Sequence, residues 1–323
     1  MKISVVIPTF NRKERLAETL NGIFNQNFSK DEYEVIVVDD GSTDGTKGYI
    51  ESLNKPQNLK YIWHKNVGRA ANRNIGVRNA TGEIIVFLDD DVVATLQLLS
   101  EHYRVHLEKN NPKLVVLGYT PFAEDIKRSS IIKYYENNWD RVFRNASKSS
   151  IEHPYWFVIT NNLSIPRLFI CSVGLFDEDF KNYSYEDSEL GYRLFKAGME
   201  FFFNKNALAY HNFEMDLEKS CQQNYQMGYS AVIYYLKHPE LKQELSIDVA
   251  MGEVHNPYIF FKRLWRQIKP VIYNDFSIKL MQKVIPLIGI LFPQKILFFF
   301  YGIIHWHYYL SGIKKGLREL NSK

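Results

Sequence analysis

The chain has 323 residues, of which 46% are hydrophobic and 24% are charged. This composition excludes disordered and fibrous proteins and allows one large core or two ordinary ones. Cys171 and Cys221 are too few for a disulfide framework or a four-ligand zinc site, so we expect reduced thiols in a cytosolic protein. The apolar run 3–7 meets Pro8 too soon for a signal peptide.

Charge is divided unevenly along the chain. Residues 1–255 hold 29 Lys and Arg against 34 Asp and Glu, a net charge of −5. Residues 256–323 hold 11 against 2, a net charge of +9. The basic C-terminal segment indicates phosphate or an anionic membrane as a partner.

Strand and helix signals alternate over the first 120 residues. Apolar, β-branched runs predict strands at 2–7, 33–38, 59–63, 83–88 and 114–117. The segments between them predict helices: one capped by Asn11, one begun by Ser42 or Thr43, and one from Gly68 to Asn79. Repeated β-α-β units predict an α/β fold with a mostly parallel sheet and helices on both faces.

Beyond residue 120 the pattern is looser. Short strands are predicted at 155–160, 201–203 and 208–211, with helices at 186–197 and 216–238. We therefore predict an α/β domain over 1–215, with halves 1–120 and 121–215. A helical, basic and aromatic extension covers 216–323.

Three of the predicted strands end in polar residues, and ligands of such sheets bind at the carboxyl ends of the strands. The ends carry Pro8-Thr9, Asp39-Asp40 and Asp89-Asp90-Asp91. Three adjacent carboxylates repel one another, and Mg²⁺ or Mn²⁺ would offset that repulsion. The alternative is a solvated acidic turn before a helix.

Three further groups of residues are candidates for the site, if the fold places them at the same rim. Gly68 opens a helix that carries Arg73, and a helix N-terminus with arginines suits phosphate, although a solvated surface helix is the alternative. Glu186 and Asp187 fall in the first turn of a predicted helix, where the helix dipole stabilises acidic side chains without any further role. The functional alternative is that a carboxylate at the rim acts as a general base. His211 ends a strand and could join a metal site.

Four segments in this order resemble the family 2 glycosyltransferases: Val5–Arg12, Val37–Asp44, Leu88–Asp91 and Tyr185–Arg193. The resemblance covers about residues 1–215. It implies a nucleotide-diphospho-sugar transferase domain of the GT-A type, a divalent metal (Mn²⁺ or Mg²⁺) and inversion at the anomeric carbon.

The resemblance also implies roles for individual residues. Pro8 and Thr9 would line the base pocket, and Asp40 would bind the base, usually uracil. Gly68 and Arg73 would face the diphosphate, Asp89 would belong to the nucleotide-sugar-binding motif, and Asp90 would lie near the ribose. Asp91 would bind the metal, with His211 as a second ligand. Asp187 matches the general base, and Asn161, Asn162 and Glu186 stand where the sugar or acceptor is contacted.

The predicted function is transfer of a hexose or N-acetylhexosamine from a nucleotide-diphosphate-sugar, a UDP-sugar by the family pattern. The acceptor would be a hydroxyl of a glycan or lipid-linked molecule in surface polysaccharide or glycoconjugate synthesis, and no nucleic acid is expected as a partner. Two alternatives stay open: a nucleotide-sugar-binding regulator or assembly partner without turnover, and a nucleotidyltransferase. A retained Asp187 disfavours the first, and the absence of a Gly-rich basic loop after the first strand disfavours the second.

The C-terminal segment 296–313 contains no Lys, Arg, Asp or Glu, and its length is near the minimum for a membrane span. Gly302 and His305 lower its hydrophobicity, however, and lysines flank it on both sides. A buried or interfacial helix is therefore expected rather than a span. We predict a cytoplasmic protein whose residues 256–323 contact the inner face of an anionic membrane, or alternatively only cover the catalytic domain.

Overall fold

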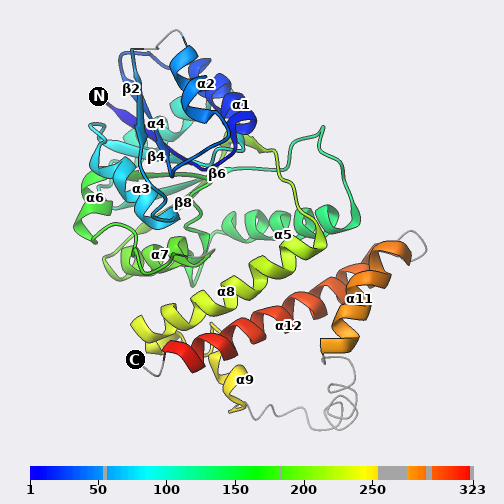
Figure 1. The fold of residues 1–323 in the computed structure, drawn as a ribbon. Helices are drawn as coiled ribbons and strands as arrows, with labels where there is room; N and C mark the ends of the chain where they lie inside the picture. The colour runs from blue at the N-terminus through cyan, green and yellow to red at the C-terminus, as the bar shows by residue number, and fades with distance from the viewer. Residues whose placement is uncertain (54–56, 182–183, 254–274, 289–292, 321–323) are drawn as a thin grey trace. The chain divides into compact units, whose positions relative to one another are not determined.

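The computed structural model describes residues 1–53, 57–181, 184–253, 275–288 and 293–320 (Figure 1). The chain forms two compact units, and each is described by itself. Unit 1 comprises Met1–Ile126, Glu136–Lys181 and Glu186–Phe213. Unit 2 comprises Lys127–Tyr135, Asn182–Tyr185 and Glu214–Lys323.

Unit 1 is built on one eight-stranded sheet with the order β3-β2-β1-β4-β7-β6-β8-β5. The strands are β1 (Ile3–Thr9), β2 (Tyr33–Asp39), β3 (Leu59–Trp63), β4 (Ile84–Leu88), β5 (Val92–Ala94), β6 (Leu114–Tyr119), β7 (Asn162–Pro166) and β8 (Glu200–His211). Strands β3, β2, β1 and β4 are parallel to one another, as are β6 and β8. Strand β7 runs antiparallel between β4 and β6, and β5 pairs antiparallel with β8, so the sheet is mixed.

Alternate side chains of the central strands enter two separate cores, because successive residues of a strand point to opposite faces. Val6 and Phe87 pack on one face with residues of α3, α6 and α7, whereas Val5 and Val86 pack on the other with residues of α1, α2 and α4. The helices of unit 1 are α1 (Lys13–Phe24), α2 (Thr46–Ser52), α3 (Arg69–Arg78), α4 (Leu98–Lys109), the later part of α5 (Ser130–Ala146), η1 (Pro154–Phe157), α6 (Arg167–Ser172) and α7 (Glu186–Lys196). Burial on both faces explains why these strands are almost wholly apolar in sequence.

Several local predictions were wrong. Residues 155–160 form no strand, because a 3₁₀ turn starting at Pro154 precedes β7, which the sequence analysis missed. The runs 201–203 and 208–211 are parts of one strand, β8. Asn11 does not cap α1; its backbone is left-handed (φ 52°), and its side chain accepts a hydrogen bond from the Thr43 amide. Asp44 binds the first amide of α2, in place of Ser42 or Thr43.

Unit 2 is helical, with α8 (Leu217–Lys237), η2 (Pro239–Leu241), α9 (Ile247–Met251), α11 (Asp275–Ile288) and α12 (Gln294–Leu320). Helices α8 and α12 lie side by side (Figure 1). Glycines permit this close approach, since a Cβ at Gly228 would lie 1.9 Å from the Tyr309 carbonyl oxygen and one at Gly312 would lie 2.0 Å from that of Tyr225. None of the helices in the described ranges is long and apolar enough to cross a membrane.

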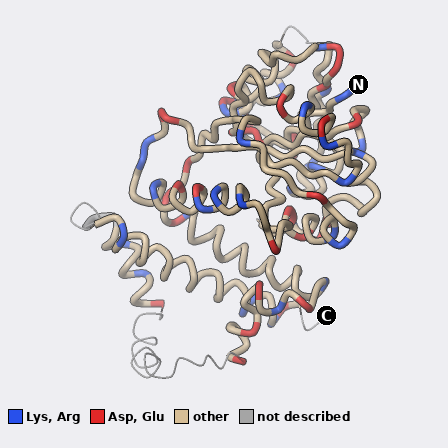
Figure 2. Tube along the Cα trace, turned by 180° about the vertical axis from the view of Figure 1, so that it is seen from behind, with Lys and Arg blue, Asp and Glu red and all other residues tan. Residues whose placement is uncertain are grey.

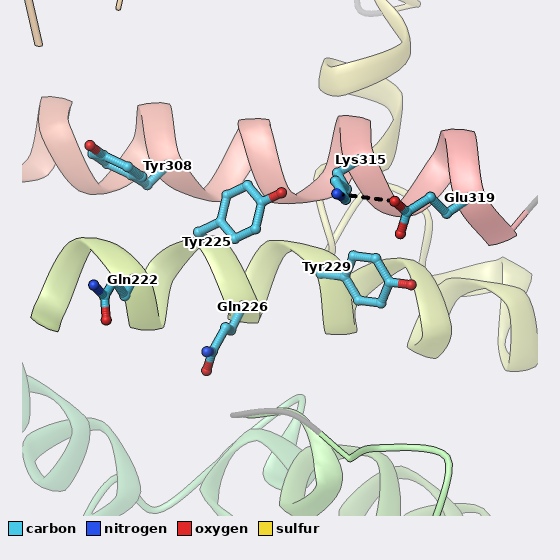
Figure 3. Close-up of a pocket in the computed structure, with 7 residues that line it drawn as sticks. All are labelled: Gln222, Tyr225, Gln226, Tyr229, Tyr308, Lys315 and Glu319. Carbon is cyan, nitrogen blue, oxygen red and sulfur yellow. Dashed lines mark ion pairs between the residues drawn. The ribbon is translucent and has the colours of Figure 1, made fainter.

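A groove follows the seam between α8 and α12 (Figure 3). It is lined by Gln222, Tyr225, Gln226, Tyr229, Tyr308, Lys315 and Glu319. Lys315 and Glu319 pair across 3.1 Å on α12, so the charges of the lining neutralise each other.

Candidate functional site

The ends of β1 and β4 meet through side chains, as parallel neighbours should. Thr9, the last residue of β1, donates its hydroxyl to Asp90 Oδ2 at 2.8 Å. Pro8 precedes it in the same strand, where it lacks an amide to donate. The carboxyl ends of β1 and β4 therefore form one rim, and the Asp triplet (Asp89, Asp90 and Asp91) lies on it.

The two acids after β2 organise the backbone around them. Asp39 is fully buried and accepts hydrogen bonds from the Ser42 amide at 2.8 Å and the Tyr61 hydroxyl at 2.6 Å. Asp40 accepts from the amides of Val67 and Gly68 at 2.8 and 3.1 Å. Asp40 thereby anchors the turn at which α3 begins, and it retains the free lone pairs of a carboxylate for a further donor.

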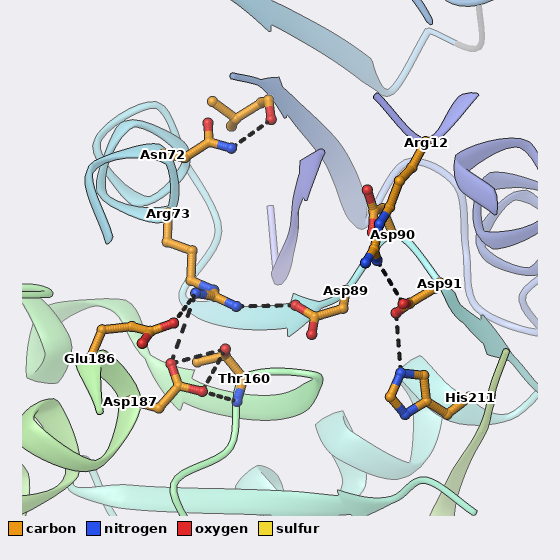
Figure 4. Close-up of polar contacts among 11 residues, drawn as sticks. Arg12, Asn72, Arg73, Asp89, Asp90, Asp91, Thr160, Glu186, Asp187 and His211 are labelled. Atoms are coloured by element: carbon orange, nitrogen blue, oxygen red, sulfur yellow. Dashed lines mark hydrogen bonds and ion pairs between the residues drawn. The ribbon is translucent and has the colours of Figure 1, made fainter. Parts of the chain in front are cut away.

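The three members of the Asp triplet point to different partners (Figure 4). Asp89 pairs with Arg73, Asp90 with Thr9 and Arg12, and Asp91 with Arg12 and His211. Burial raises the pKa of Asp90 to about 6, although Arg12 opposes the shift. Burial also acts to raise the pKa of Asp91, but His211 and Arg12 outweigh it and lower the value to about 2. At neutral pH Asp91 is therefore an ionised carboxylate beside an imidazole.

Arg73 lies at the centre of a second cluster of acids (Figure 4). Its side chain is 4% exposed and donates to Asp89 Oδ1 and Glu186 Oε1, each at 3.1 Å, while Asp187 Oδ1 lies 4.0 Å away. Two buried polar atoms, Arg73 Nε and Glu186 Oε2, have no hydrogen-bond partner among the described residues. The cluster thus retains hydrogen-bonding capacity that a ligand could use.

Asp187 is the second residue of α7, and its carboxylate is held by Thr160, to which the sequence assigned no role. Its carboxylate accepts hydrogen bonds from the Thr160 amide at 3.0 Å and the Thr160 hydroxyl at 2.9 Å. Burial raises the pKa of Asp187 to about 6, and Glu186 adds to the shift while Arg73 and the Thr160 amide oppose it. A carboxylate with such a pKa is mostly ionised at pH 7 and close to the optimum for proton transfer.

The predicted pair Asn161 and Asn162 differ in their surroundings, because within the described ranges only the Asn162 side chain has hydrogen-bond partners. Asn162 is fully buried, with its amide engaged by His102 Nε2 at 2.8 Å and the Ala207 carbonyl at 2.9 Å. Asn161 is only 4% exposed, and neither its Nδ2 nor its Oδ1 has a partner among the described residues. Asn161 is consequently the member with an amide free to bind a ligand.

Two residues of the site were missed from sequence. Arg12 stands in the first quoted segment and was given no role, yet it binds both Asp90 and Asp91. Thr160 carries no sequence signal, because its partner Asp187 is 27 residues further along the chain. Its position three residues after the end of β1 was the only available hint for Arg12.

Asp91 and His211 suit a divalent cation as part of its ligand set. Asp91 Oδ1 lies 3.3 Å from His211 Nε2, and His211 Nδ1 is buried without a hydrogen-bond partner in the described part of the chain. A carboxylate with an imidazole matches the preferences of Mn²⁺, and substrate phosphates commonly complete such sites. Within the described residues no three His, Cys, Asp or Glu side chains gather closely enough to hold a metal by themselves.

Solved structures share the architecture. A mannosyltransferase, PcManGT from Pyrobaculum calidifontis in complex with GDP-Man and Mn²⁺, superposes with a TM-score of 0.62 at 18% identity, covering 98% of this chain and 87% of that one. Residues 1–349 of TarS from S. aureus with UDP-GlcNAc give a TM-score of 0.56 at 16% identity, covering 99% and 92%. The fold is therefore that of the GT-A glycosyltransferases, as predicted.

The sequence places the chain in a family. Residues 4–162 match the glycosyl transferase family 2 profile, and the chain belongs to that family. It is 33% identical over 258 residues to the uncharacterized glycosyltransferase YfnE of Bacillus subtilis (strain 168), covering 65% of this chain and 64% of that protein. It is 31% identical over 237 residues to a chondroitin synthase of Escherichia coli, covering 65% of this chain and 34% of that protein. The chain thus spans less than two thirds of these relatives.

Proposed function

We propose that this protein is an inverting glycosyltransferase with Asp187 as its general base. The observation that carries the proposal is the placement of Asp187: a carboxylate with a pKa of about 6, held at the rim beside Arg73 and Asp89. Such a carboxylate takes the proton of an acceptor hydroxyl as that oxygen attacks the anomeric carbon. Attack opposite the departing nucleoside diphosphate inverts the anomeric centre.

The donor we propose is a UDP-sugar carrying a hexose or N-acetylhexosamine. Thr9 and Asp40 lie at the ends of adjacent parallel strands, the position at which such sheets bind nucleotides. Relatives support the donor class, since TarS binds UDP-GlcNAc, although PcManGT is complexed with GDP-Man. The orphaned amide of Asn161 and the free oxygen of Glu186 are suited to hydroxyl groups of the sugar or acceptor.

Asp91 and His211 are the residues that would hold Mn²⁺ or Mg²⁺. When bound, the cation would supply positive charge for the diphosphate that leaves. Arg12 and Arg73 already place two fixed positive charges next to the Asp triplet. These arginines reduce the repulsion that a diphosphate would meet at an acidic rim.

The acceptor we propose is a glycan or a lipid-linked glycan of surface polysaccharide or glycoconjugate synthesis. Relatives span this range, and one is a GalNAc(5)-diNAcBac-PP-undecaprenol β-1,3-glucosyltransferase of Campylobacter jejuni, 42% identical over 93 residues. A cytoplasmic location with residues 256–323 on the inner membrane face would bring the site to such an acceptor.

The test of this function is product analysis with a labelled sugar nucleotide. Wild type should transfer the sugar with inverted configuration, and Asp187→Asn should lower turnover by about 10²–10⁴-fold while it still binds the donor. Asp31→Asn, on the exposed surface, is the matched control. Formation of labelled sugar 1-phosphate together with a nucleoside triphosphate, when pyrophosphate is supplied, would favour a nucleotidyltransferase. Donor binding without any product would favour a regulator.

A further inference from the structure

The carboxylate of Asp187 is fixed on one side by a single residue. The Thr160 amide donates to Oδ2 at 3.0 Å, and the Thr160 hydroxyl lies 3.1 Å from Oδ1 and 2.9 Å from Oδ2. Thr160 is 1% exposed, so water does not compete for these contacts. Both oxygens of the carboxylate are therefore constrained by one neighbour on a different element (Figure 4).

Thr160 itself is held in place by the strand that follows it. Asn162, two residues later, donates to the Ala207 carbonyl of β8 at 2.9 Å and meets His102 Nε2 of α4 at 2.8 Å. The other ring nitrogen of His102 lies 2.8 Å from the Ser164 hydroxyl. These buried contacts join the start of β7 to both α4 and β8, and so they fix the chain two residues after Thr160.

The opposite side of Asp187 is charged. Arg73 of α3 lies 4.0 Å from Oδ1, Glu186 precedes Asp187 in α7, and Asp89 follows β4 on the far side of Arg73. Arg73 attracts the carboxylate while the two acids repel it, so without a second anchor the side chain could rotate toward the guanidinium. The Thr160 hydroxyl and amide supply that anchor.

We infer that Thr160 is a positioning residue for the reaction, which aims the Asp187 carboxylate at the acceptor hydroxyl and stabilises its ionised form. This inference rests on the proposed function, because it takes Asp187 as the general base. A hydroxyl that donates to a carboxylate favours the charged state. A displacement of the base by about 1 Å is enough to cost about 10²-fold in rate.

The test compares Thr160→Val, which removes the hydroxyl but keeps the size and the amide, with Thr160→Ser, which keeps the hydroxyl. We expect Thr160→Val to lower kcat by about 10–100-fold at pH 7. The acid limb of its kcat–pH profile should move up by about one pH unit, so that the deficit shrinks as the pH rises. Thr160→Ser should stay within about threefold of wild type, with an unmoved acid limb. KM for the sugar nucleotide should change little in both.

The control is Thr19→Val, because Thr19 is also fully buried and its hydroxyl has no partner in the described part of the chain. Its kcat and pH profile should match wild type. If Thr160→Val does not fold, as judged by circular dichroism, Thr160→Ala replaces it in the same pH series. An unmoved acid limb in a folded variant that lacks the hydroxyl would overturn the inference, as would a Thr160→Ser variant as impaired as Thr160→Val.

Asp187→Asn separates this inference from the proposed function. If Asp187→Asn keeps wild-type turnover, the assignment of the base and the inference about Thr160 both fail. If Asp187→Asn is inactive and the Thr160→Val profile does not move, the base stands and the role of Thr160 alone fails.

Discussion

Arg73 Nη1 donates to Glu186 Oε1 at 3.1 Å and so joins α3 to α7 across 113 residues of sequence. Both side chains are buried, and Arg73 also binds Asp89. Removing one partner of a buried ion pair leaves an uncompensated charge, which costs far more than the intact pair contributes. Arg73 is therefore required to neutralise the buried carboxylates of the site, and this role does not depend on any contact between Arg73 and a diphosphate.

Replacing Arg73 by Met should lower the free energy of unfolding by about 3–5 kcal/mol, because Asp89, Glu186 and Asp187 would face one another without a cation. Urea denaturation at pH 7.5 measures the change. Arg78→Met is the matched control on the same helix: Arg78 is 58% exposed and pairs with Glu178 at 3.3 Å, so its loss should cost less than about 1 kcal/mol. Equal losses in the two variants would contradict the buried-network account.

The rim of the site could be predicted from sequence because parallel strands bring their carboxyl ends to one edge. Thr9 and the Asp triplet belong to neighbouring strands, and polar residues after apolar runs mark such ends. The partners within the rim could not be predicted. Asp89 and Asp91 turn to opposite partners, Arg73 and His211, because the backbone rotates between them, and no periodicity in the sequence encodes that.

Elements after residue 120 were harder to predict for a physical reason. The sequence analysis placed a strand at 155–160, where aromatic and β-branched residues give a strand signal, but Pro154 starts a 3₁₀ turn instead. Ser184 and Tyr185 have positive φ angles of 81° and 74° directly before Glu186. Such strained residues are uncommon and gather at functional sites, and local propensity argues against them.

Acidification should destabilise unit 1 through His102. Burial lowers the pKa of His102 to about 4, although its contact with Asn162 opposes the shift. The unfolded chain binds this proton near pH 6.5, so stability is complete above that pH and falls as the pH drops toward 4.

Between pH 7 and pH 5 wild type should therefore lose about 2 kcal/mol more than His102→Gln, which cannot be protonated in this range. Urea titrations at the two pH values measure the difference. His153→Gln is the control because the His153 side chain is 47% exposed, and it should lose as much stability on acidification as wild type. If His102→Gln loses as much as wild type, the acid sensitivity has another source.

Metal removal is expected to stop transfer. Asp91→Asn keeps the size of the side chain but removes the only negative charge that the pair Asp91 and His211 offers a cation, so transfer should fall by at least about 10²-fold. Calorimetric titration with Mn²⁺ and the nucleoside diphosphate should show weaker binding than for wild type. Excess EDTA should inactivate wild type, and Mn²⁺ should restore it, whereas Asp125→Asn on the exposed surface should behave as wild type. Full activity in EDTA would refute the metal requirement.

Unit 2 exposes apolar side chains beside lysines. On α11, Phe276 is 77% exposed and Leu280 is 53% exposed, and the exposed Lys279 and Lys283 lie on the same helix. On α12, Phe299 is 58% exposed, and the middle of that helix carries no charge (Figure 2). Other basic and aromatic residues of the segment 256–323, among them Trp265 and Phe292, fall in 254–274 and 289–292 and so lie outside the described residues.

Binding to anionic vesicles should follow from this arrangement and should weaken as salt rises. Each lysine near an anionic surface contributes about 1 kcal/mol, so Lys279→Gln with Lys283→Gln should weaken binding by about 10–30-fold in vesicle co-sedimentation. Phe276→Ser should weaken binding at every salt concentration, because it removes apolar contact rather than charge. Lys30→Gln, an exposed lysine of unit 1, should leave binding unchanged. Equal binding to neutral and anionic vesicles would refute the electrostatic contribution. Binding to neither kind of vesicle would refute membrane contact by unit 2 altogether.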